Sequence, residues 1–175
     1  MTSSPTCQSA GVARRFAKAG LIALAPDDLS SLGGYPGNDG DGKALQSKID
    51  REKLLNDFFN GFEFLYNHQD TTQKIGAVGF CYGGGVCNAL AVAYPELSAS
   101  VPFYGSQAKA EDVPRIKAPL MLHFAELDER INKGWPEYEA ALKANNKKYE
   151  AHIYKDCNHG FHNDSTPRYD VKNAD

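Results

Sequence analysis

The 175-residue sequence is poor in the features that mark several large classes of protein. It has no excess of basic charge, since 19 Lys and Arg stand against 22 Asp and Glu, so neither nucleic acid nor an anionic membrane is an expected partner. Its apolar runs are far shorter than the roughly 20 residues that a membrane-spanning helix needs. With 42% hydrophobic and 23% charged residues, the composition instead predicts a globular domain with a single hydrophobic core.

The sequence also has few cysteines, and they are scattered. They form no CxxC pair, no zinc-ligand spacing and no dense disulfide framework, so reduced thiols are expected and no metal or other cofactor is predicted. Residues 1–7 lack the charged and apolar regions of a signal peptide, which favours a cytoplasmic location. The four cysteines are Cys7, Cys81, Cys87 and Cys157.

Helical and strand patterns alternate along the chain. Apolar residues at helical spacing predict helices at residues 12–19, 49–67, 84–94 and 135–145. Short apolar runs predict strands at residues 21–25, 75–79, 100–104, 119–124 and 149–154, and the Gly- and Pro-rich residues 26–42 predict a long loop. Apolar strands that alternate with helices are typical of a parallel sheet covered by helices on both faces, so the predicted fold class is α/β.

A glycine-rich motif, G-F-C-Y-G-G at residues 79–84, lies between a predicted strand and a predicted helix. This is the context of a nucleophile elbow, in which glycines let the strand and the helix approach closely. Cys81 is therefore the candidate nucleophile, and the N–H of Tyr82 is a candidate oxyanion donor at the start of the helix. The alternative is a glycine-rich turn around a small, inert, buried cysteine.

An acid is expected after a later strand, because an α/β-hydrolase triad runs nucleophile, acid, base along the chain. Asp128 follows the strand predicted at residues 119–124 and is the best candidate. Glu126 and Glu129 are its neighbours and stay open as alternatives. A mere capping role for Asp128 is not expected, since the helix predicted at residues 135–145 starts too far along the chain.

A base is expected after the last strand, where His159 follows residues 149–154. His162 is its one serious rival, but it is better interpreted as a residue that lines the pocket. The expected chemistry is proton transfer from the Cys81 thiol to His159, attack on an ester or lactone carbonyl, and hydrolysis of a thioester. The other histidines are His68 at a helix end and His123 and His152 within strands, where structural roles are commoner.

These motifs together resemble the dienelactone hydrolase family, also called carboxymethylenebutenolidases, of the α/β-hydrolase superfamily. The resemblance also includes V-A-R-R at residues 12–15, A-P-D at residues 25–27, N-H-G-F at residues 158–161 and P-R-Y at residues 167–169. It implies hydrolysis of enol-lactones such as dienelactone. The triad that it implies is Cys81, Asp128 and His159.

The resemblance also implies arginines that hold the carboxylate of the substrate. Arg168, nine residues beyond His159, is the candidate, and its alternative role is that of a solvated charge in the tail. Arg130, two residues beyond Asp128, is the weaker candidate. Tyr35, in the predicted 26–42 loop, is a further candidate for the pocket, or a cover for the core.

The sequence departs from the family pattern at both ends. Residues 1–11 are atypical, because family members carry there further strands, a loop with the second oxyanion donor, and a glutamate beside the resting cysteine. No helix is predicted in the polar tail at residues 168–175, where the fold would close. Residues 1–175 are therefore expected to form a single but incomplete α/β-hydrolase domain, without the first strands and the last helix.

Two other functions remain as alternatives to an ester or lactone hydrolase that acts on small molecules. One is an impaired hydrolase that serves as a binding or scaffold chain. The other is a class I glutamine amidotransferase, in which a glutamate stands two residues after the histidine. Phe161 occupies that position here, which disfavours an amidotransferase. Separately, the exposed sheet edges predict that another chain, as in a homo-oligomer, covers them.

Overall fold

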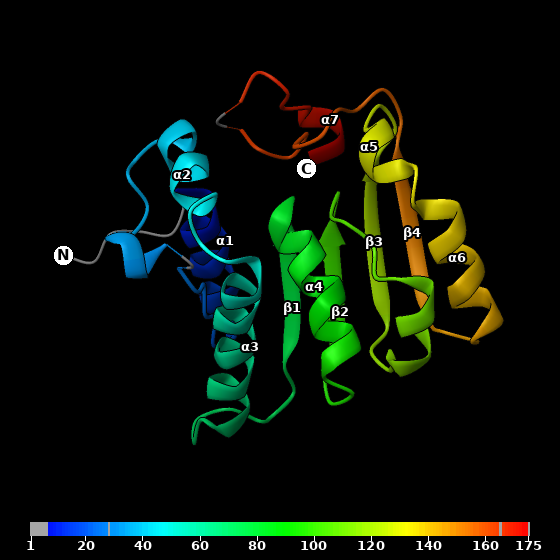
Figure 1. Cartoon of the computed structure of the whole chain (residues 1–175), viewed down its shortest axis with the longest axis horizontal. Coiled ribbons are helices and arrows are strands. Elements are labelled where there is room, and N and C mark those ends of the chain that lie inside the picture. Colours follow the sequence, from blue (N-terminus) through cyan, green and yellow to red (C-terminus); the bar gives the residue numbers. More distant parts are fainter. Residues whose placement is uncertain (1–6, 28, 165, 175) are drawn as a thin grey trace. The chain divides into compact units, whose positions relative to one another are not determined.

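The computed structural model describes residues 7–27, 29–164 and 166–174, which divide into two compact units between Gln73 and Lys74 (Figure 1). The described part of the first unit contains α1 (Cys7–Lys18), the 3-10 helix η1 (Ser30–Leu32), α2 (Asp39–Gln46) and α3 (Arg51–Asn67). The second unit contains β1 (Gly76–Phe80), α4 (Tyr82–Ala93), β2 (Ala99–Phe103), η2 (Ala110–Arg115), β3 (Leu120–Ala125), α5 (Glu129–Asn132), α6 (Trp135–Ala144), β4 (Tyr149–Tyr154) and α7 (Val171–Ala174).

Both helices predicted in the first unit are present. α3 corresponds to the helix predicted at residues 49–67, and Asp50 caps it by accepting hydrogen bonds from two backbone N–H groups of the first turn (2.9 and 3.1 Å). α1 corresponds to the helix predicted at residues 12–19 but begins at Cys7, in the segment for which no element was predicted. Residues 1–6 lie outside the described residues.

Two predictions for the first unit are wrong. The strand predicted at residues 21–25 is irregular backbone, in which Leu21 is 56% exposed. A strand needs a neighbour to pair with its backbone, and the described residues of this unit contain no strand. The loop predicted at residues 26–42 includes η1 and the start of α2, where the Asn38 side chain accepts a hydrogen bond from the N–H of Asp41 (2.9 Å). Glycines in that first turn gave it the composition of a loop.

The second unit is built on a four-stranded parallel sheet in the order β1-β2-β3-β4. Its register aligns Phe80, Phe103, His123 and His152 in one row across the sheet. Four of the five predicted strands are present, and the α/β class with a parallel sheet is confirmed. Because all the strands run the same way, the residues that follow them meet at one edge, where open α/β sheets hold their sites.

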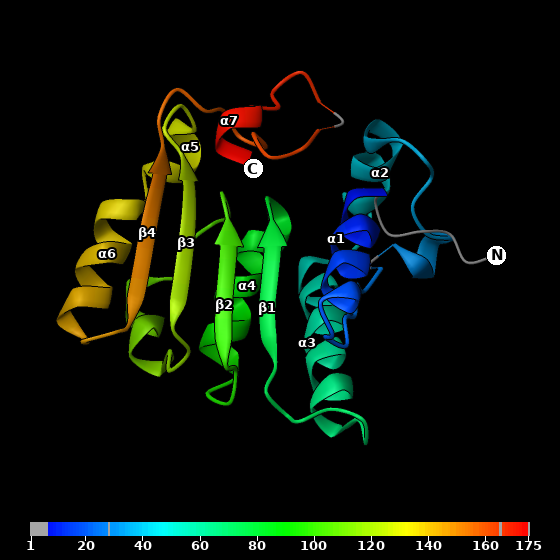
Figure 2. The same cartoon turned by 180° about the vertical axis from the view of Figure 1, so that it is seen from behind.

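α4 and α6 lie on one face of this sheet and contact each other there. The Ser100 hydroxyl of β2 donates a hydrogen bond to the carbonyl of Cys87 in α4 (3.0 Å). The Tyr138 hydroxyl of α6 donates to the Asn88 side chain of α4 (3.2 Å). The opposite face carries no helix from the described residues of this unit (Figure 2).

Two short α-helices of the second unit were not predicted. α5 is a single turn after β3, and α7 lies in the tail for which no helix was expected. One turn is too short for hydrophobic periodicity to show, so each depends on a capping aspartate instead. Asp128 accepts from the N–H of Ile131 (3.4 Å), and Asp170 accepts from the N–H of Asn173 (3.0 Å). None of the helices in the described ranges combines the length and apolar character that a bilayer crossing requires.

Three glycines allow β1, β2 and α4 to meet around residue 81. A methyl group at Gly79 would lie 2.2 Å from the carbonyl oxygen of Gly83. A methyl group at Gly84 would lie 2.6 Å from the carbonyl oxygen of Phe103, and one at Gly105 would lie 2.2 Å from the carbonyl carbon of Gly84. These neighbours are backbone atoms and cannot rotate away, so any side chain at these positions would push the helix off the sheet.

We expect Gly105→Ala to lower the free energy of unfolding of the second unit by at least ~3 kcal/mol, because the new methyl group overlaps the α4 backbone. Gly83→Ala is the matched control, since its methyl group would meet no atom within 4 Å. It should be neutral or stabilising by up to ~1 kcal/mol. Urea denaturation followed by the fluorescence of Trp135, the single tryptophan, measures both variants. Equal midpoints for the two would contradict the close approach.

Candidate active site

Cys81 lies between β1 and α4 with φ 56° and ψ −115°, a backbone conformation that non-glycine residues rarely adopt. Its N–H donates to the carbonyl of Phe103 at the end of β2 (3.1 Å). Its own carbonyl accepts from the N–H groups of Gly84 (3.1 Å) and Gly85 (3.3 Å) in the first turn of α4. This network holds the strained residue in place, and the cysteine is exposed at the carboxyl edge of the sheet.

Asp128 and His159 are hydrogen-bonded to each other through Oδ2 and Nδ1, at 2.5 Å. Asp128 is 8% exposed and follows β3, whereas His159 follows β4. The other carboxylate oxygen of Asp128 accepts from the N–H of Ile131 and caps α5. The expectation that Asp128 caps no helix is therefore wrong, because α5 is too short to be predicted. The two contacts use different oxygens, so the cap also fixes the carboxylate that faces the imidazole.

The Cys81 thiol is hydrogen-bonded to His159, and this bond is the largest cause of a pKa below the usual 9.0. Burial opposes the shift, while the imidazole charge, the N–H of Tyr82 and the charge of Arg130 favour it. The pKa of His159 is raised, first by the same bond to Cys81 and then, against burial, by the bond to Asp128. The opposite shifts favour a thiolate beside an imidazolium.

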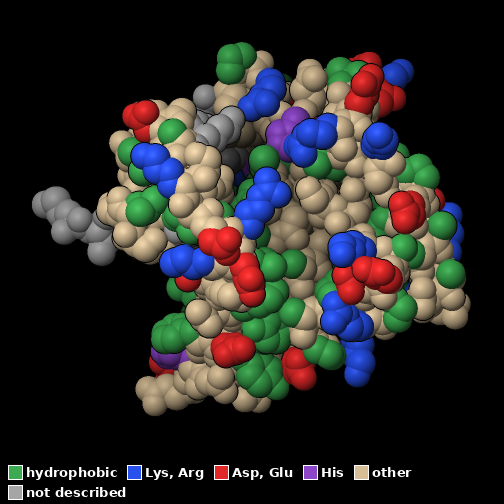
Figure 3. All heavy atoms as spheres, viewed as in Figure 1, with side chains coloured by type: hydrophobic (Ala, Val, Ile, Leu, Met, Phe, Trp, Pro, Cys, Tyr) green, Lys and Arg blue, Asp and Glu red, His purple; other side chains and the backbone are tan. Residues whose placement is uncertain are grey.

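The two candidate arginines lie within electrostatic range of this group. Arg130 is exposed on α5, and its charge lowers the pKa of Cys81. Arg168 has its guanidinium 3.6 Å from the position that a Cβ would take at Gly160, the residue after His159. Figure 3 shows Lys and Arg side chains beside histidine near the carboxyl ends of the strands. Both guanidinium groups therefore add positive charge near Cys81 and His159.

His162 is brought to the site but does not replace His159. Its Nδ1 is hydrogen-bonded to the hydroxyl of Tyr104, and its ring stacks on Phe80 with centroids 4.1 Å apart. Tyr35 belongs to the first unit, where its ring packs beside Gly42. Its role in the pocket stays a prediction.

Among the other candidate acids and bases, Glu126 and His123 have structural contacts. Glu126 accepts a hydrogen bond from the N–H of Asp156 (2.8 Å), and Glu129 is exposed on α5. His123 is 8% exposed and hydrogen-bonded to the Tyr154 hydroxyl (2.8 Å), and burial lowers its pKa to about 4. Among the described residues, no group of three or more His, Cys, Asp and Glu could hold a metal ion.

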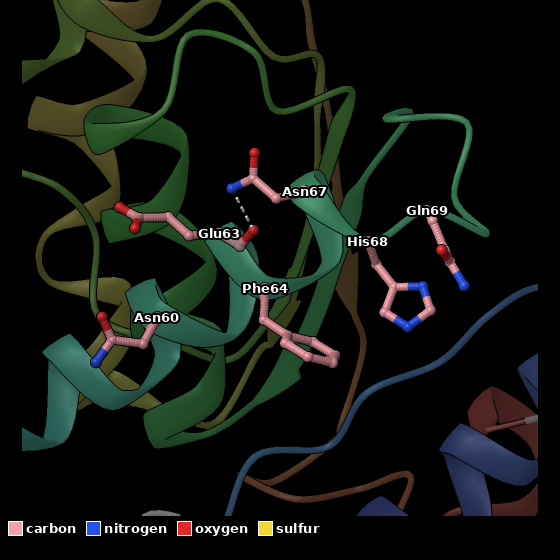
Figure 4. Close-up of a pocket in the computed structure, with 6 residues that line it drawn as sticks. All are labelled: Asn60, Glu63, Phe64, Asn67, His68 and Gln69. Atoms are coloured by element: carbon pink, nitrogen blue, oxygen red, sulfur yellow. Dashed lines mark hydrogen bonds between the residues drawn. The ribbon is translucent and has the colours of Figure 1, made fainter.

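His68 lies in the first unit, at the end of α3. It contributes to an open hollow and faces the ring of Phe64, with centroids 5.4 Å apart (Figure 4). None of the residues that line this hollow is a cysteine or serine that could act as a nucleophile, or an arginine that could bind a carboxylate. It is lined by Asn60, Glu63, Phe64, Asn67, His68 and Gln69.

Tyr104 was not predicted as a site residue. It follows β2 at the level at which Cys81 follows β1, because Phe80 and Phe103 are paired in the register. It is 2% exposed, and its ring lies 4.7 Å from the ring of His159. The signal that could have found it is its position directly after a strand of a parallel sheet, where site residues gather.

The parallel sheet, the elbow and the cysteine, histidine and aspartate at its carboxyl edge define a chain of the α/β-hydrolase type. A profile described as the dienelactone hydrolase family matches residues 7–175, so the chain belongs to the dienelactone hydrolase family.

Individual relatives cover different shares of the chain. It is 35% identical over 137 residues to protein usf of Aquifex pyrophilus, which is 74% of this chain and 58% of that one. It is 37% identical over 91 residues to a carboxymethylenebutenolidase homolog of Xenopus tropicalis, 51% of this chain and 37% of that one. This chain thus covers 58% of the length of the first of these curated relatives and 37% of the second.

A solved structure with the same fold is that of a dienelactone hydrolase-like promiscuous phosphotriesterase from metagenomic libraries. The two superpose with a TM-score of 0.79 at 22% identity, over 99% of this chain and 77% of the other. At this identity the likeness establishes the fold alone.

The pH dependence of Cys81 alkylation should report its contact with His159. We expect iodoacetamide to modify Cys81 with a midpoint below the ordinary thiol pKa of 9.0. In His159→Gln the midpoint should rise toward that value, since the variant removes the hydrogen bond and the positive charge that stabilise the thiolate. Peptide mass mapping identifies the modified cysteine, and the buried Cys87, whose pKa burial raises to about 12, should stay unmodified. An unchanged midpoint in the variant would show that His159 does not act on the thiol.

Proposed function

We propose that the chain hydrolyses a carboxylic ester or lactone with Cys81 as nucleophile, His159 as general base and Asp128 as the orienting acid. The observation that carries the proposal is the continuous hydrogen-bonded series from Cys81 through His159 to Asp128 at the carboxyl edge of the sheet. These are the contacts that nucleophilic catalysis requires: a nucleophile bonded to a base, and a base oriented by a third group.

The first half-reaction transfers the acyl group to the sulfur. His159 takes the proton of the Cys81 thiol, and the thiolate forms a bond to the carbonyl carbon of the substrate. When the tetrahedral intermediate collapses, its bond to the alcohol oxygen breaks and the imidazolium gives its proton to that oxygen. The alcohol leaves, or in a lactone stays attached, and a thioester remains on Cys81.

The second half-reaction returns the enzyme. His159, now neutral, takes a proton from water as the water oxygen attacks the thioester carbonyl. The carbon–sulfur bond breaks, the sulfur is released as the thiolate, and the carboxylic acid product leaves. Asp128 stabilises the imidazolium in both halves and keeps its Nδ1–H pointing away from the substrate.

The N–H of Tyr82 is the proposed oxyanion donor. Tyr82 opens α4 directly after the nucleophile, and its N–H already stabilises negative charge on the Cys81 sulfur. The N-terminal end of the 12-residue α4 adds a partial positive charge at the same place. One such donor contributes about 10²–10³ in rate in comparable sites.

The positive environment favours a substrate that carries a carboxylate. Arg168 is the proposed partner of that carboxylate, because its guanidinium lies against Gly160 beside the base. Arg130 contributes charge at the nucleophile instead. Enol-lactones such as dienelactone have both the reactive ring ester and the carboxylate, and the family membership supports this class of substrate.

The amidotransferase alternative loses support from the position of Phe161. This side chain is 1% exposed and packs in a core cluster with Tyr104 and Cys157. A phenyl ring has no hydrogen-bond acceptor, so it cannot orient an imidazole as a glutamate would. Asp128 provides the carboxylate that orients His159. A scaffold without catalysis is the outcome that the next experiment tests.

Hydrolysis of p-nitrophenyl acetate and of dienelactone should depend on Cys81. We expect Cys81→Ala to lower kcat by at least ~10³-fold, because no other nucleophile follows β1. Cys87→Ala is the matched control, since it removes a buried thiol of α4 that the mechanism does not use and should retain activity. If the folded wild type hydrolyses neither compound, or the Cys81→Ala variant keeps its rate, the proposed function is wrong.

Arg168→Gln should separate substrates by charge. We expect KM for dienelactone to rise about tenfold, the effect of losing a charge-assisted hydrogen bond, with little change for the uncharged p-nitrophenyl acetate. Lys172→Gln, which removes an exposed charge from α7, should change neither. Equal changes for the two substrates would rule out recognition of the carboxylate by Arg168.

A further inference from the structure

We propose that Tyr104 is a positioning residue that holds the base loop, residues 159–162, in the place from which His159 reaches Cys81. The inference rests on the proposed function, in which His159 is the base. Tyr104 contacts three of the four residues of this loop. Its ring lies 4.7 Å from the ring of His159 and 5.8 Å from that of Phe161, and its hydroxyl is hydrogen-bonded to Nδ1 of His162.

Tyr104 can serve as an anchor because its own position is fixed by the sheet. Its N–H donates to the carbonyl of His123 in β3 (2.7 Å), which continues the pairing of β2 beyond its last residue. Its backbone has φ 36°, and the next residue, Gly105, packs directly against the backbone of Gly84 in α4. The ring is 2% exposed and the backbone that carries it is held on both sides, so the side chain has little freedom to move.

The base loop needs such an anchor because it follows the strand at the other edge of the sheet from the nucleophile. The loop follows β4, whereas the nucleophile follows β1, at the other end of the strand order. Tyr104 ties the loop to β2, and the stacking of His162 on Phe80 (4.1 Å) ties it to β1. The two contacts share His162, so together they bring the base across the sheet to the nucleophile.

The hydroxyl of Tyr104 keeps its proton beside the Cys81 thiolate. Burial, and then the charge of Cys81, raise the pKa of this phenol above its usual 10.0, against a smaller opposing effect of Arg168. The phenol therefore stays protonated when the thiolate forms. A buried hydroxyl without a partner would be costly, so the bond to His162 also favours the folded loop.

Tyr104→Phe tests this positioning role, since it keeps the ring against His159 and removes only the hydroxyl. We expect kcat for p-nitrophenyl acetate to fall about tenfold with KM changed less than about twofold, because a displaced base costs rate and not binding. The midpoint of Cys81 alkylation by iodoacetamide should move to higher pH, toward the His159→Gln value. An alkylation profile equal to that of the wild type would overturn the proposal.

Tyr138→Phe is the matched control. Tyr138 is also a buried tyrosine, 1% exposed, whose hydroxyl donates a single hydrogen bond, to Asn88, but it lies on the face of the sheet that carries α4 and α6. It should lose a similar amount of stability in urea and leave the alkylation profile unchanged. If both variants shifted the profile alike, the effect would be one of stability and the proposal would fail.

A double variant tests whether the hydroxyl acts through His162. His162→Phe keeps an aromatic ring on Phe80 but removes Nδ1, so Tyr104→Phe/His162→Phe should be no worse than either single variant. If the losses of kcat in the two single variants added up in the double variant, the proposed positioning role would be overturned. Alkylation of Cys81 does not require the enzyme to turn over. If neither ester were hydrolysed but Tyr104→Phe still shifted the alkylation profile, the proposed hydrolysis would be refuted and the positioning role of Tyr104 would stand.

Discussion

The contact between Gly84 and Gly105 is the constraint on which the second unit depends. It seats the first turn of α4 against the end of β2, where a single methyl group on either residue would overlap backbone atoms. That approach aims the N-terminal end of α4 at Cys81, and it places Tyr104 at the same level of the sheet as Cys81. One backbone contact thus sets both the electrostatic environment of the thiol and the surface on which the base loop rests.

Asp128 and His159, the proposed acid and base, are positioned by the pairing of β3 with β4. Beyond the last paired residues, the N–H of Glu126 donates to Tyr154 and that of Leu127 donates to Cys157, each at 3.0 Å. The Glu126 carboxylate accepts from the N–H of Asp156 (2.8 Å), so this alternative acid braces the loop instead. The two loops are therefore joined by backbone bonds close to the residues where Asp128 and His159 meet.

The sequence predicts what is decided locally or by the sheet edge, and little else. The place of Cys81 at a turn from strand to helix could be predicted because six residues encode the elbow. The place of Asp128 at the sheet edge could be predicted because parallel strands end at one edge. Tyr104 could not, because its role depends on a loop that folds back from beyond β4. The strand predicted at residues 21–25 is wrong because its formation also depends on a distant segment. An apolar run forms a strand only when another strand lies beside it.

The exposure of Cys81 has a chemical consequence that the burial of its partners does not share. A partly buried imidazole bonded to a buried carboxylate keeps its interactions strong, because little water competes for them. In the proposed mechanism, in contrast, water must reach the thioester on Cys81. Cys81 is exposed, whereas the side chains of His159 and Asp128 are 22% and 6% exposed. Solvent exposure therefore decreases from the sulfur to the carboxylate. This gradient agrees with the proposed hydrolysis, because water would reach an acyl group on the sulfur more easily than the bond between His159 and Asp128.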